Sequence, residues 1–277
     1  MSFTERWEII MKILNVDMDN TLIYSYKRDI GNDKINVELY NGREISYITA
    51  RSFELLSKIK DKFLVVPTTT RTKEQYERIF LGIGHIKYAL VCNGGVLLVD
   101  GKKNEEWYKT SKELVSESVG ELLKAIDYLE REKLRTFEVR FIEELFVFTK
   151  CDKPEKVVAD LRKKLDNSLV EVFNNGVKVY VVPKKLDKGT SVIRFKAYIE
   201  SMQKSEKIEK IVAAGDSEFD ISMVKCADMG LVPKGFMKKF GLENNNETIC
   251  EMKGEKIFAE EFMEKLLMEV DNIWTKN

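Results

Sequence analysis

The sequence predicts an α/β fold with a mainly parallel central sheet, into which a smaller α+β unit is inserted. Three observations support this. Short apolar segments alternate with segments of helical period along most of the chain. Between about 109 and 184 the order changes to helix, strand, strand, twice over. With 277 residues, 44% of them apolar, the chain is long enough for such a core. We therefore expect a discontinuous core domain, 1–108 and 185–277, and an inserted domain, 109–184.

The first part of the core is expected to supply three strands, two helices and a hairpin. Thr49 is a suitable N-cap for the first of these helices. The hairpin covers Val37–Tyr47, because Asn41-Gly42 stands between strand-like flanks. The strands are expected at Lys12–Val16, Phe63–Val66 and Tyr88–Cys92, and the helices at Thr49–Lys60 and Lys73–Phe80.

The insert begins with a long amphipathic pattern that predicts one helix over Ser111–Glu132. A second helix is expected over Pro154–Leu165, with proline near its first turn. The strands of the insert are expected at Arg135–Phe141, Leu145–Lys150, Leu169–Phe173 and Val177–Val182. The core then resumes with helices at Thr190–Met202, Glu218–Lys225 and Ala259–Met268 and strands at Lys210–Ala214 and Met229–Val232.

The composition excludes several classes of function. Lys and Arg total 46, as do Asp and Glu, so no basic surplus indicates a nucleic-acid or membrane partner. No apolar run approaches the ~20 residues of a membrane span, and the N-terminus has no signal-peptide pattern. The four cysteines lie far apart, which favours a reducing, cytoplasmic location. Because His85 is the only histidine, catalysis must use carboxylates, lysines, hydroxyls or thiols.

Polar residues follow the ends of four predicted core strands. In open parallel sheets, ligands bind beyond the carboxyl ends of the strands, so we expect these groups to converge on one crevice. They are Asp17, Asp19, Asn20 and Thr21 after the first strand; Thr68, Thr69, Thr70 and Arg71 after the second; Asn93 after the third; Asp216, Ser217 and Asp220 after the fourth; and Lys188 at the start of the preceding helix.

The carboxylates of this set predict a metal site. Asp17 and Asp19 lie close together, and their repulsion requires a cation or a proton. Mg²⁺ suits them, because it prefers oxygen ligands and often retains a substrate phosphate among its ligands. Asp216 would complete the protein ligands, and Asp220 could join directly or through water. The alternative is that each aspartate only caps a helix or a turn. That explanation is a common one for a single aspartate, but it is much weaker for the whole set.

Other polar residues of the set fit phosphoryl chemistry. Lys188 can neutralise both a nucleophilic carboxylate and a phosphoryl group, although a solvated lysine at a helix start is also common. A hydroxyl from Thr69, or from Thr68, could bind a phosphoryl oxygen, but the same stretch also fits a polar turn with a capping threonine. Asn93 with its two following glycines could be only a tight turn.

These motifs resemble the haloacid dehalogenase superfamily of phosphotransferases. The first motif, Asp-x-Asp-x-Thr, stands as DMDNTL at 17–22, and the fourth stands as GDSEFD at 215–220. TTR at 69–71, NGG at 93–95 and LDKGTS around Lys188 match the sugar-phosphatase branch. The insert also lies between the second and third motifs, where this branch carries an α/β cap. The first and fourth motifs, with the lysine between them, are specific together.

The resemblance implies a Rossmann-like core, a cap that closes over the substrate, and Mg²⁺-dependent hydrolysis of a small phosphorylated metabolite such as a sugar phosphate. Members of the branch resemble sucrose-phosphate, trehalose-phosphate and mannosyl-phosphoglycerate phosphatases and phosphomannomutases. The implied roles are a nucleophile, Asp17; a general acid and base, Asp19; charge stabilisation, Lys188 and Thr69; metal binding, Asp17, Asp19 through its carbonyl, Asp216 and Asp220; and substrate binding, Asn93, Arg71 and Thr21.

Three features depart from the pattern of the superfamily. Phe219 replaces the usual Asn of the fourth motif, Thr70 replaces the usual Gly of the second, and the stretch Tyr24–Tyr47 is longer than a minimal flap. The departures at Phe219 and Thr70 leave open a weakly active binding or regulatory homologue, although the intact carboxylates argue against it. A phosphomutase that uses the same aspartate also stays open. The substrate and the oligomeric state are open too. Specificity is expected in the cap and in the 24–47 segment, where solvated surface is favoured for Arg43 and Arg140.

Overall fold

The computed structural model describes residues 9–202, 206–242 and 247–274. Its central sheet has five strands in the order β15-β14-β13-β1-β5, and every neighbouring pair is parallel. The mainly parallel sheet expected from the sequence is thus confirmed. The strands are β1 (Ile9–Val16), β5 (Leu64–Pro67), β13 (Glu206–Ala214), β14 (Met229–Val232) and β15 (Ile249–Glu251).

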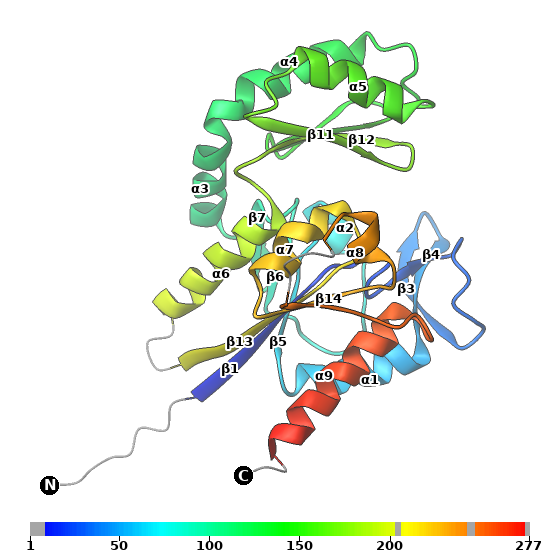
Figure 1. Cartoon of the computed structure of the whole chain (residues 1–277), viewed down its shortest axis with the longest axis vertical. Coiled ribbons are helices and arrows are strands. Elements are labelled where there is room, and N and C mark those ends of the chain that lie inside the picture. Colours follow the sequence, from blue (N-terminus) through cyan, green and yellow to red (C-terminus); the bar gives the residue numbers. More distant parts are fainter. Residues whose placement is uncertain (1–8, 203–205, 243–246, 275–277) are drawn as a thin grey trace, which may run out of the picture.

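The two faces of the central sheet are covered by different helices. Because successive side chains of a strand point to opposite faces, Leu14 and Val16 of β1 pack on one side and Ile13 on the other. The first side is covered by α1 (Ala50–Lys60) and α9 (Phe258–Trp274), and the second by α6 (Lys188–Met202) and α7 (Ile221–Cys226). Helices on both sides of the sheet (Figure 1) explain why adjacent positions of β1, such as Ile13 and Leu14, are both apolar.

The third predicted strand lies beside β5 but belongs to a separate antiparallel sheet. That sheet is formed by β6 (Tyr88–Val91), β7 (Val96–Val99) and β8 (Lys102–Lys103), and one parallel bridge, Thr68 to Leu90, joins it to the end of β5. The NGG motif is therefore the turn of a hairpin that the sequence did not predict. Gly94 is needed there, since its φ is +83° and a Cβ atom would lie 2.3 Å from the Ser191 side chain.

The 24–47 segment forms a small antiparallel sheet at one side of the core (Figure 1). The predicted hairpin is present, and Asn41 and Gly42 have the positive φ values, 51° and 73°, that a two-residue hairpin turn favours. We call this sheet the flap. Its strands are β2 (Tyr24–Ser25), β3 (Lys34–Tyr40) and β4 (Arg43–Thr49), in the order β2-β4-β3.

A third antiparallel sheet faces the core from the insert, and we call it the cap sheet. It contains β9 (Arg140–Ile142), β10 (Phe146–Lys150), β11 (Val170–Asn175) and β12 (Lys178–Pro183), in the order β11-β12-β10-β9. Helices α4 (Val119–Glu130) and α5 (Pro154–Lys164) pack on the face away from the core (Figure 1). Val147, Val179 and Val181 supply that face, so alternate residues of the same strands face the core. The domain boundaries at 109 and 184 stay a prediction.

The expectation of one helix over Ser111–Glu132 was wrong. Helix α3 (Glu105–Val115) begins earlier, because the Asn104 side chain accepts the N–H of Trp107 as an N-cap. A 3₁₀ turn over Ser116–Ser118 then separates α3 from α4. The bend lets α3 pack on the core through Trp107 while α4 covers the cap sheet. Amphipathic periodicity continues through this bend, which is why the pattern resembled one helix.

Three further elements differ from expectation. Helix α2 (Lys73–Tyr76) stops before Phe80, whose N–H bonds to the Val37 carbonyl of the flap instead of continuing the helix. The strand expected from Arg135 begins at Arg140, since Arg135 forms only an isolated bridge. The helix expected over Glu218–Lys225 is split into a 3₁₀ turn (Glu218–Asp220) and α7. The sequence did not predict β15 or α8 (Phe236–Lys239).

Within the described ranges, none of the helices combines the length and apolar character that a membrane span requires.

Candidate active site

Asp17 stands at the carboxyl end of β1, which lies between β13 and β5 in the central sheet. Its backbone N–H bonds to the Ala214 carbonyl of β13 at 2.9 Å. Its side chain is 8% exposed and accepts a hydrogen bond of 2.5 Å from the Lys188 ammonium. The same ammonium lies 2.5 Å from a carboxylate oxygen of Asp220. Lys188 is itself 1% exposed, so the helix start of α6 places a buried cation between the first and fourth motifs.

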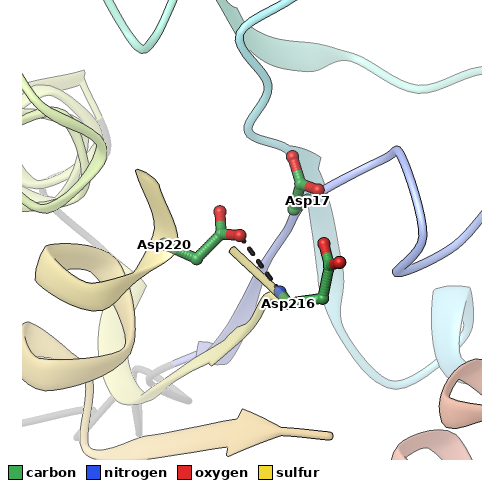
Figure 2. Close-up of side chains that lie close together, drawn as sticks. All are labelled: Asp17, Asp216 and Asp220. Carbon is green, nitrogen blue, oxygen red and sulfur yellow. Dashed lines mark hydrogen bonds between the residues drawn. The ribbon is translucent and has the colours of Figure 1, made fainter. Parts of the chain in front are cut away.

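Three carboxylates share this buried point. Figure 2 shows Asp17, Asp216 and Asp220 converging from two loops, and one oxygen atom of each lies within 4.8 Å of the others. Burial raises the pKa of Asp17 well above its ordinary value; Lys188 opposes this, and Asp220 adds to it. Burial, and then repulsion from Asp220, raises the pKa of Asp216 to about 7. One ammonium therefore does not balance the three acids, and the oxygen donors fit a hard divalent cation.

Asp220 holds the loop of the fourth motif in place. Its second oxygen accepts the N–H groups of Asp216 and Ser217, at 3.0 and 2.9 Å, and the Ser217 hydroxyl at 2.8 Å. Gly215 permits this close packing, because a Cβ atom there would lie 2.3 Å from the Cβ of Asp220. With Lys188 on its other oxygen, Asp220 is well placed to orient the site and only secondarily to bind a metal.

Thr21 lies beneath the three carboxylates, away from solvent. Its hydroxyl donates to a carboxylate oxygen of Asp216 at 3.4 Å, and the residue is fully buried. The Tyr24 hydroxyl donates to the Thr21 carbonyl, which fixes this turn against the core. The position of Thr21, predicted as a substrate contact, therefore suits orientation of Asp216.

Asp19 points away from the carboxylate cluster, toward the cleft, and its side chain is 51% exposed. Arg71 donates two hydrogen bonds to it, at 2.7 and 2.8 Å, and a third to Glu38 at 2.9 Å. Partial burial would raise the pKa of Asp19, but the hydrogen bonds and charge of Arg71 outweigh it and lower this pKa. Arg71, predicted as a substrate contact, is thus already engaged by two carboxylates.

The threonines and Asn93 separate into different roles. Thr68 turns into the core, where its hydroxyl accepts from Asn15 at 3.1 Å. Thr69 is buried beside the site, and its oxygen accepts the Arg71 N–H at 3.2 Å, so Thr69 is the better placed of the two for a phosphoryl oxygen. The Asn93 amide donates to the Leu186 carbonyl at 3.3 Å, two residues before Lys188. Asn93 therefore supports the loop that positions the lysine.

A cleft of about 590 Å³ lies between the flap, the second-motif loop and the cap sheet. Asp19 and Arg71 line its core side. The sequence did not predict the residues on the cap side of the cleft, since they lie far along the chain and match no motif. For Arg140 the sequence favoured solvated surface. Alternation along β10 and β12 was the only signal that could have grouped them. These cap residues are Arg140, Ile142, Phe146, Phe148, Lys150, Lys178 and Tyr180.

Phe219, which departs from the fourth motif, connects the loop of that motif to the cap sheet. Its ring is 4.7 Å from that of Phe173 and 4.9 Å from that of Tyr180, with both pairs edge-to-face. The residue is 9% exposed and belongs to a cluster that includes residues of core and cap. An apolar side chain is therefore appropriate at this position, where the core loop touches the cap.

Comparison with known proteins agrees with this architecture. Residues 126–232 match the model of the haloacid dehalogenase-like hydrolase family, a segment that contains Lys188, Asp216 and Asp220. No curated protein matches the sequence.

Solved structures share the fold over almost the whole chain. The sucrose-phosphatase of Synechocystis sp. PCC6803, solved with sucrose and phosphate, is 14% identical with a TM-score of 0.61, over 94% of this chain and 97% of that one. A haloacid dehalogenase-like hydrolase of B. subtilis is 15% identical with a TM-score of 0.55, over 92% and 100%. A superfamily phosphatase of Bacteroides thetaiotaomicron is 15% identical with a TM-score of 0.53, over 96% and 97%. The chain is thus similar to the haloacid dehalogenase-like hydrolases over residues 126–232, and it shares its fold with these solved structures.

Proposed function

We propose that the protein is a Mg²⁺-dependent phosphomonoester hydrolase that acts through an aspartyl-phosphate on Asp17, with a small phosphorylated metabolite such as a sugar phosphate as substrate. The observation that carries this proposal is the buried contact of Asp17 with Lys188, 2.5 Å long, beside two further carboxylates. The hydrolase family match and the fold shared with a sucrose-phosphatase support the same reaction class.

Asp17 would be the nucleophile. A carboxylate oxygen attacks phosphorus, an acyl-phosphate bond forms, and the bond from phosphorus to the leaving oxygen breaks. Lys188 holds one oxygen of Asp17, which leaves the other available for attack. The ammonium also offsets the negative charge that accumulates when an anionic phosphate approaches an anionic carboxylate. The Thr69 hydroxyl, buried beside the same loop, would bind an equatorial oxygen.

Asp19 would transfer the protons. In the first step its carboxylic acid protonates the leaving oxygen, and in the second its carboxylate takes a proton from the water that hydrolyses the aspartyl-phosphate. The pair of hydrogen bonds from Arg71 stabilises the carboxylate form, which suits the second step. For the first step, Asp19 must loosen its contact with Arg71 and take up a proton.

Asp17 and Asp216 would hold the metal, with Asp220 and Thr21 orienting Asp216. The residues of the site suit a divalent cation. Their donors are buried carboxylate oxygens, which repel one another and outnumber the one ammonium among them. Bound Mg²⁺ would supply positive charge that neutralises both the nucleophile and the transferred phosphoryl group.

A reducing, cytoplasmic location is also proposed. The four cysteines are free thiols in the structure, and two of them, Cys92 and Cys151, are buried. Proteins that persist in oxidising compartments more often pair such residues.

Release of inorganic phosphate from phosphorylated sugars, nucleotides and an aryl phosphate, measured with Mg²⁺ and with EDTA, tests the proposal. Wild type is expected to release phosphate only with the metal, and Asp17→Asn to release none while still folded by circular dichroism. Equal release by Asp17→Asn would refute the nucleophile. A phosphomutase would give an isomerised sugar phosphate without net release of phosphate.

A further inference from the structure

The cleft that Asp19 lines has a charge opposite to that of a phosphorylated substrate, in a chain whose formal net charge is zero. Six basic side chains line it, against two acidic ones, Asp19 and Glu38. A cleft lined mainly by one sign of charge concentrates ligands of the other sign. The basic lining residues are Lys27, Arg71, Arg78, Arg140, Lys150 and Lys178.

Half of these basic side chains, the three arginines, are already paired with acidic groups of the protein. Arg71 binds Asp19 and Glu38, and Arg78 binds Glu38 at 3.1 Å. On the cap, Arg140 donates to Glu138 at 2.6 Å. These three arginines therefore have little charge left for a ligand.

Lys150 and Lys178, which we call the cap lysine pair, differ from the arginines. In the part of the chain that the structure describes, neither of them forms an ion pair with an acidic side chain; Lys150 only packs its ammonium over the Phe137 ring, at 4.6 Å. They stand directly opposite each other on the antiparallel strands β10 and β12. Like charges in that arrangement destabilise a sheet unless an anion lies between them.

The cap lysine pair lines the cleft, on the face of the cap sheet that is directed toward the core. Phe148 and Tyr180, the next pair along the same face of the sheet, also line the cleft. Lys178 is close enough to Asp19 for its charge to help lower the pKa of that carboxyl. Burial lowers the pKa of Lys178; the charge of Asp19 opposes this and that of Lys150 adds to it, so an added anion would benefit both lysines.

We infer that the cap lysine pair binds a second anionic group of the substrate, a carboxylate or a second phosphate, separate from the phosphoryl group that Asp17 attacks. This inference rests on the proposed function and names its substrate class: a phosphomonoester with a further negative charge on the leaving-group side. The neighbouring aromatic face of Phe148 and Tyr180 would pack against the carbon skeleton between the two anions.

Selectivity measurements test the inference. For each protein, kcat/KM is measured with 3-phosphoglycerate (second group a carboxylate), fructose 1,6-bisphosphate (second group a phosphate), and glucose 6-phosphate and p-nitrophenyl phosphate, which lack a second anion. Wild type is expected to prefer one of the first two over glucose 6-phosphate, and which one it prefers identifies the second anion. Lys150→Ala and Lys178→Ala should each reduce that preference about tenfold, mainly through KM. Lys156→Ala, an exposed cap lysine on α5, should leave the preference unchanged.

Three outcomes would overturn it. Wild type could hydrolyse p-nitrophenyl phosphate but not prefer a doubly anionic compound, or the lysine variants could retain the wild-type preference; either result rejects the second-anion site and leaves the proposed function standing. If wild type hydrolyses nothing, the proposed function fails. Calorimetric titration of 3-phosphoglycerate and fructose 1,6-bisphosphate into wild type, Lys178→Ala and Lys156→Ala then decides the site by itself, since equal affinities across the three proteins reject it.

Discussion

The Arg71 guanidinium donates two hydrogen bonds, of 2.7 and 2.8 Å, to the Asp19 carboxylate, although the two residues lie 52 positions apart in the sequence. The contact lowers the pKa of Asp19 and therefore acts against its use as an acid. It joins the first and second motifs across the mouth of the cleft. The proton-transfer step of the proposed reaction depends on how readily this pair separates.

Replacing Arg71 should change the pH dependence of catalysis. The alkaline limb of kcat/KM for a sugar phosphate reports loss of the Asp19 proton, so Arg71→Ala should move that limb upward by about one pH unit or more, as expected for loss of charge-assisted hydrogen bonds. Arg71→Lys keeps a positive charge and should move it less. An unchanged alkaline limb in Arg71→Ala would show that Arg71 does not control the protonation of Asp19.

Metal affinity should depend on pH near neutrality. The pKa of Asp216 is raised to about 7, and Mg²⁺ binds the deprotonated carboxylate. Protons therefore compete with the metal as the pH falls. Below pH 7 the apparent affinity for Mg²⁺, measured by titration of activity or by calorimetry, should weaken about tenfold per pH unit. An affinity that stays constant between pH 8 and pH 5 would argue against Asp216 as a ligand.

Asp216→Asn should separate metal binding from stability. A carboxyl whose pKa is raised by folding destabilises the fold as the pH rises through that pKa, so removing its charge should stabilise the metal-free protein at pH 8, by about 2 kcal/mol. The same variant should lose the increase in Tm that Mg²⁺ gives to wild type. Thermal unfolding with EDTA and with Mg²⁺ measures both effects. Glu218→Gln, in the same loop but outside the cluster, should keep the Mg²⁺ effect; equal Mg²⁺ effects in Asp216→Asn and wild type would contradict the site.

Lys188 should be important for stability as well as for chemistry. Lys188→Met would leave Asp17 and Asp220 buried without their cation, and breaking a buried ion pair in this way costs about 3–5 kcal/mol. Urea unfolding at pH 8 in EDTA measures this loss, with the exposed Lys184→Met as control. A loss no greater than that of the control would mean that the ammonium is not needed to hold the carboxylates together.

Phe219 should couple the cap sheet to the metal-site loop. Phe219→Ala removes two aromatic contacts across that junction and should destabilise the protein by about 3 kcal/mol, near the lower end for large buried side chains. Hydrogen exchange in β11 and β12 should become faster, because the cap sheet loses a contact with the core. Phe219→Leu keeps most of the apolar volume and should show a smaller effect. Unchanged exchange in the alanine variant would exclude this coupling.

The core of the site was predictable from the sequence because it depends on local order. A residue that follows a buried parallel strand must lie at the carboxyl edge of the sheet, and this rule predicts that Asp17 and Asp216 come together. Lys188, at the start of a helix, was expected beside them from the same convergence and contacts Asp17. The positions of Thr21 and Asn93 could not be predicted from the sequence. Each depends on which neighbour accepts the hydrogen bond that the side chain donates.

The residues on the cap side of the cleft could not be predicted from the sequence, for a different reason. Lys150 and Lys178 become neighbours only through the register of an antiparallel sheet, and the sequence sets that register too weakly to fix which residues face each other. Helical periodicity failed between α3 and α4 because the apolar pattern continues through the bend. In the sequence Phe219 is only a departure from a motif, because its partners Phe173 and Tyr180 come from the cap.

The most direct test of the central claim is the covalent state of Asp17 during turnover. Wild type, mixed with an aryl phosphate and Mg²⁺ and quenched in acid within the first turnovers, should gain the mass of one phosphoryl group, and peptide mapping should place that group on Asp17. Asp17→Asn should gain none under the same conditions. A phosphoryl group on another residue, or phosphate release by wild type with no labelled protein at any quench time and full activity in Asp17→Asn, would contradict the account.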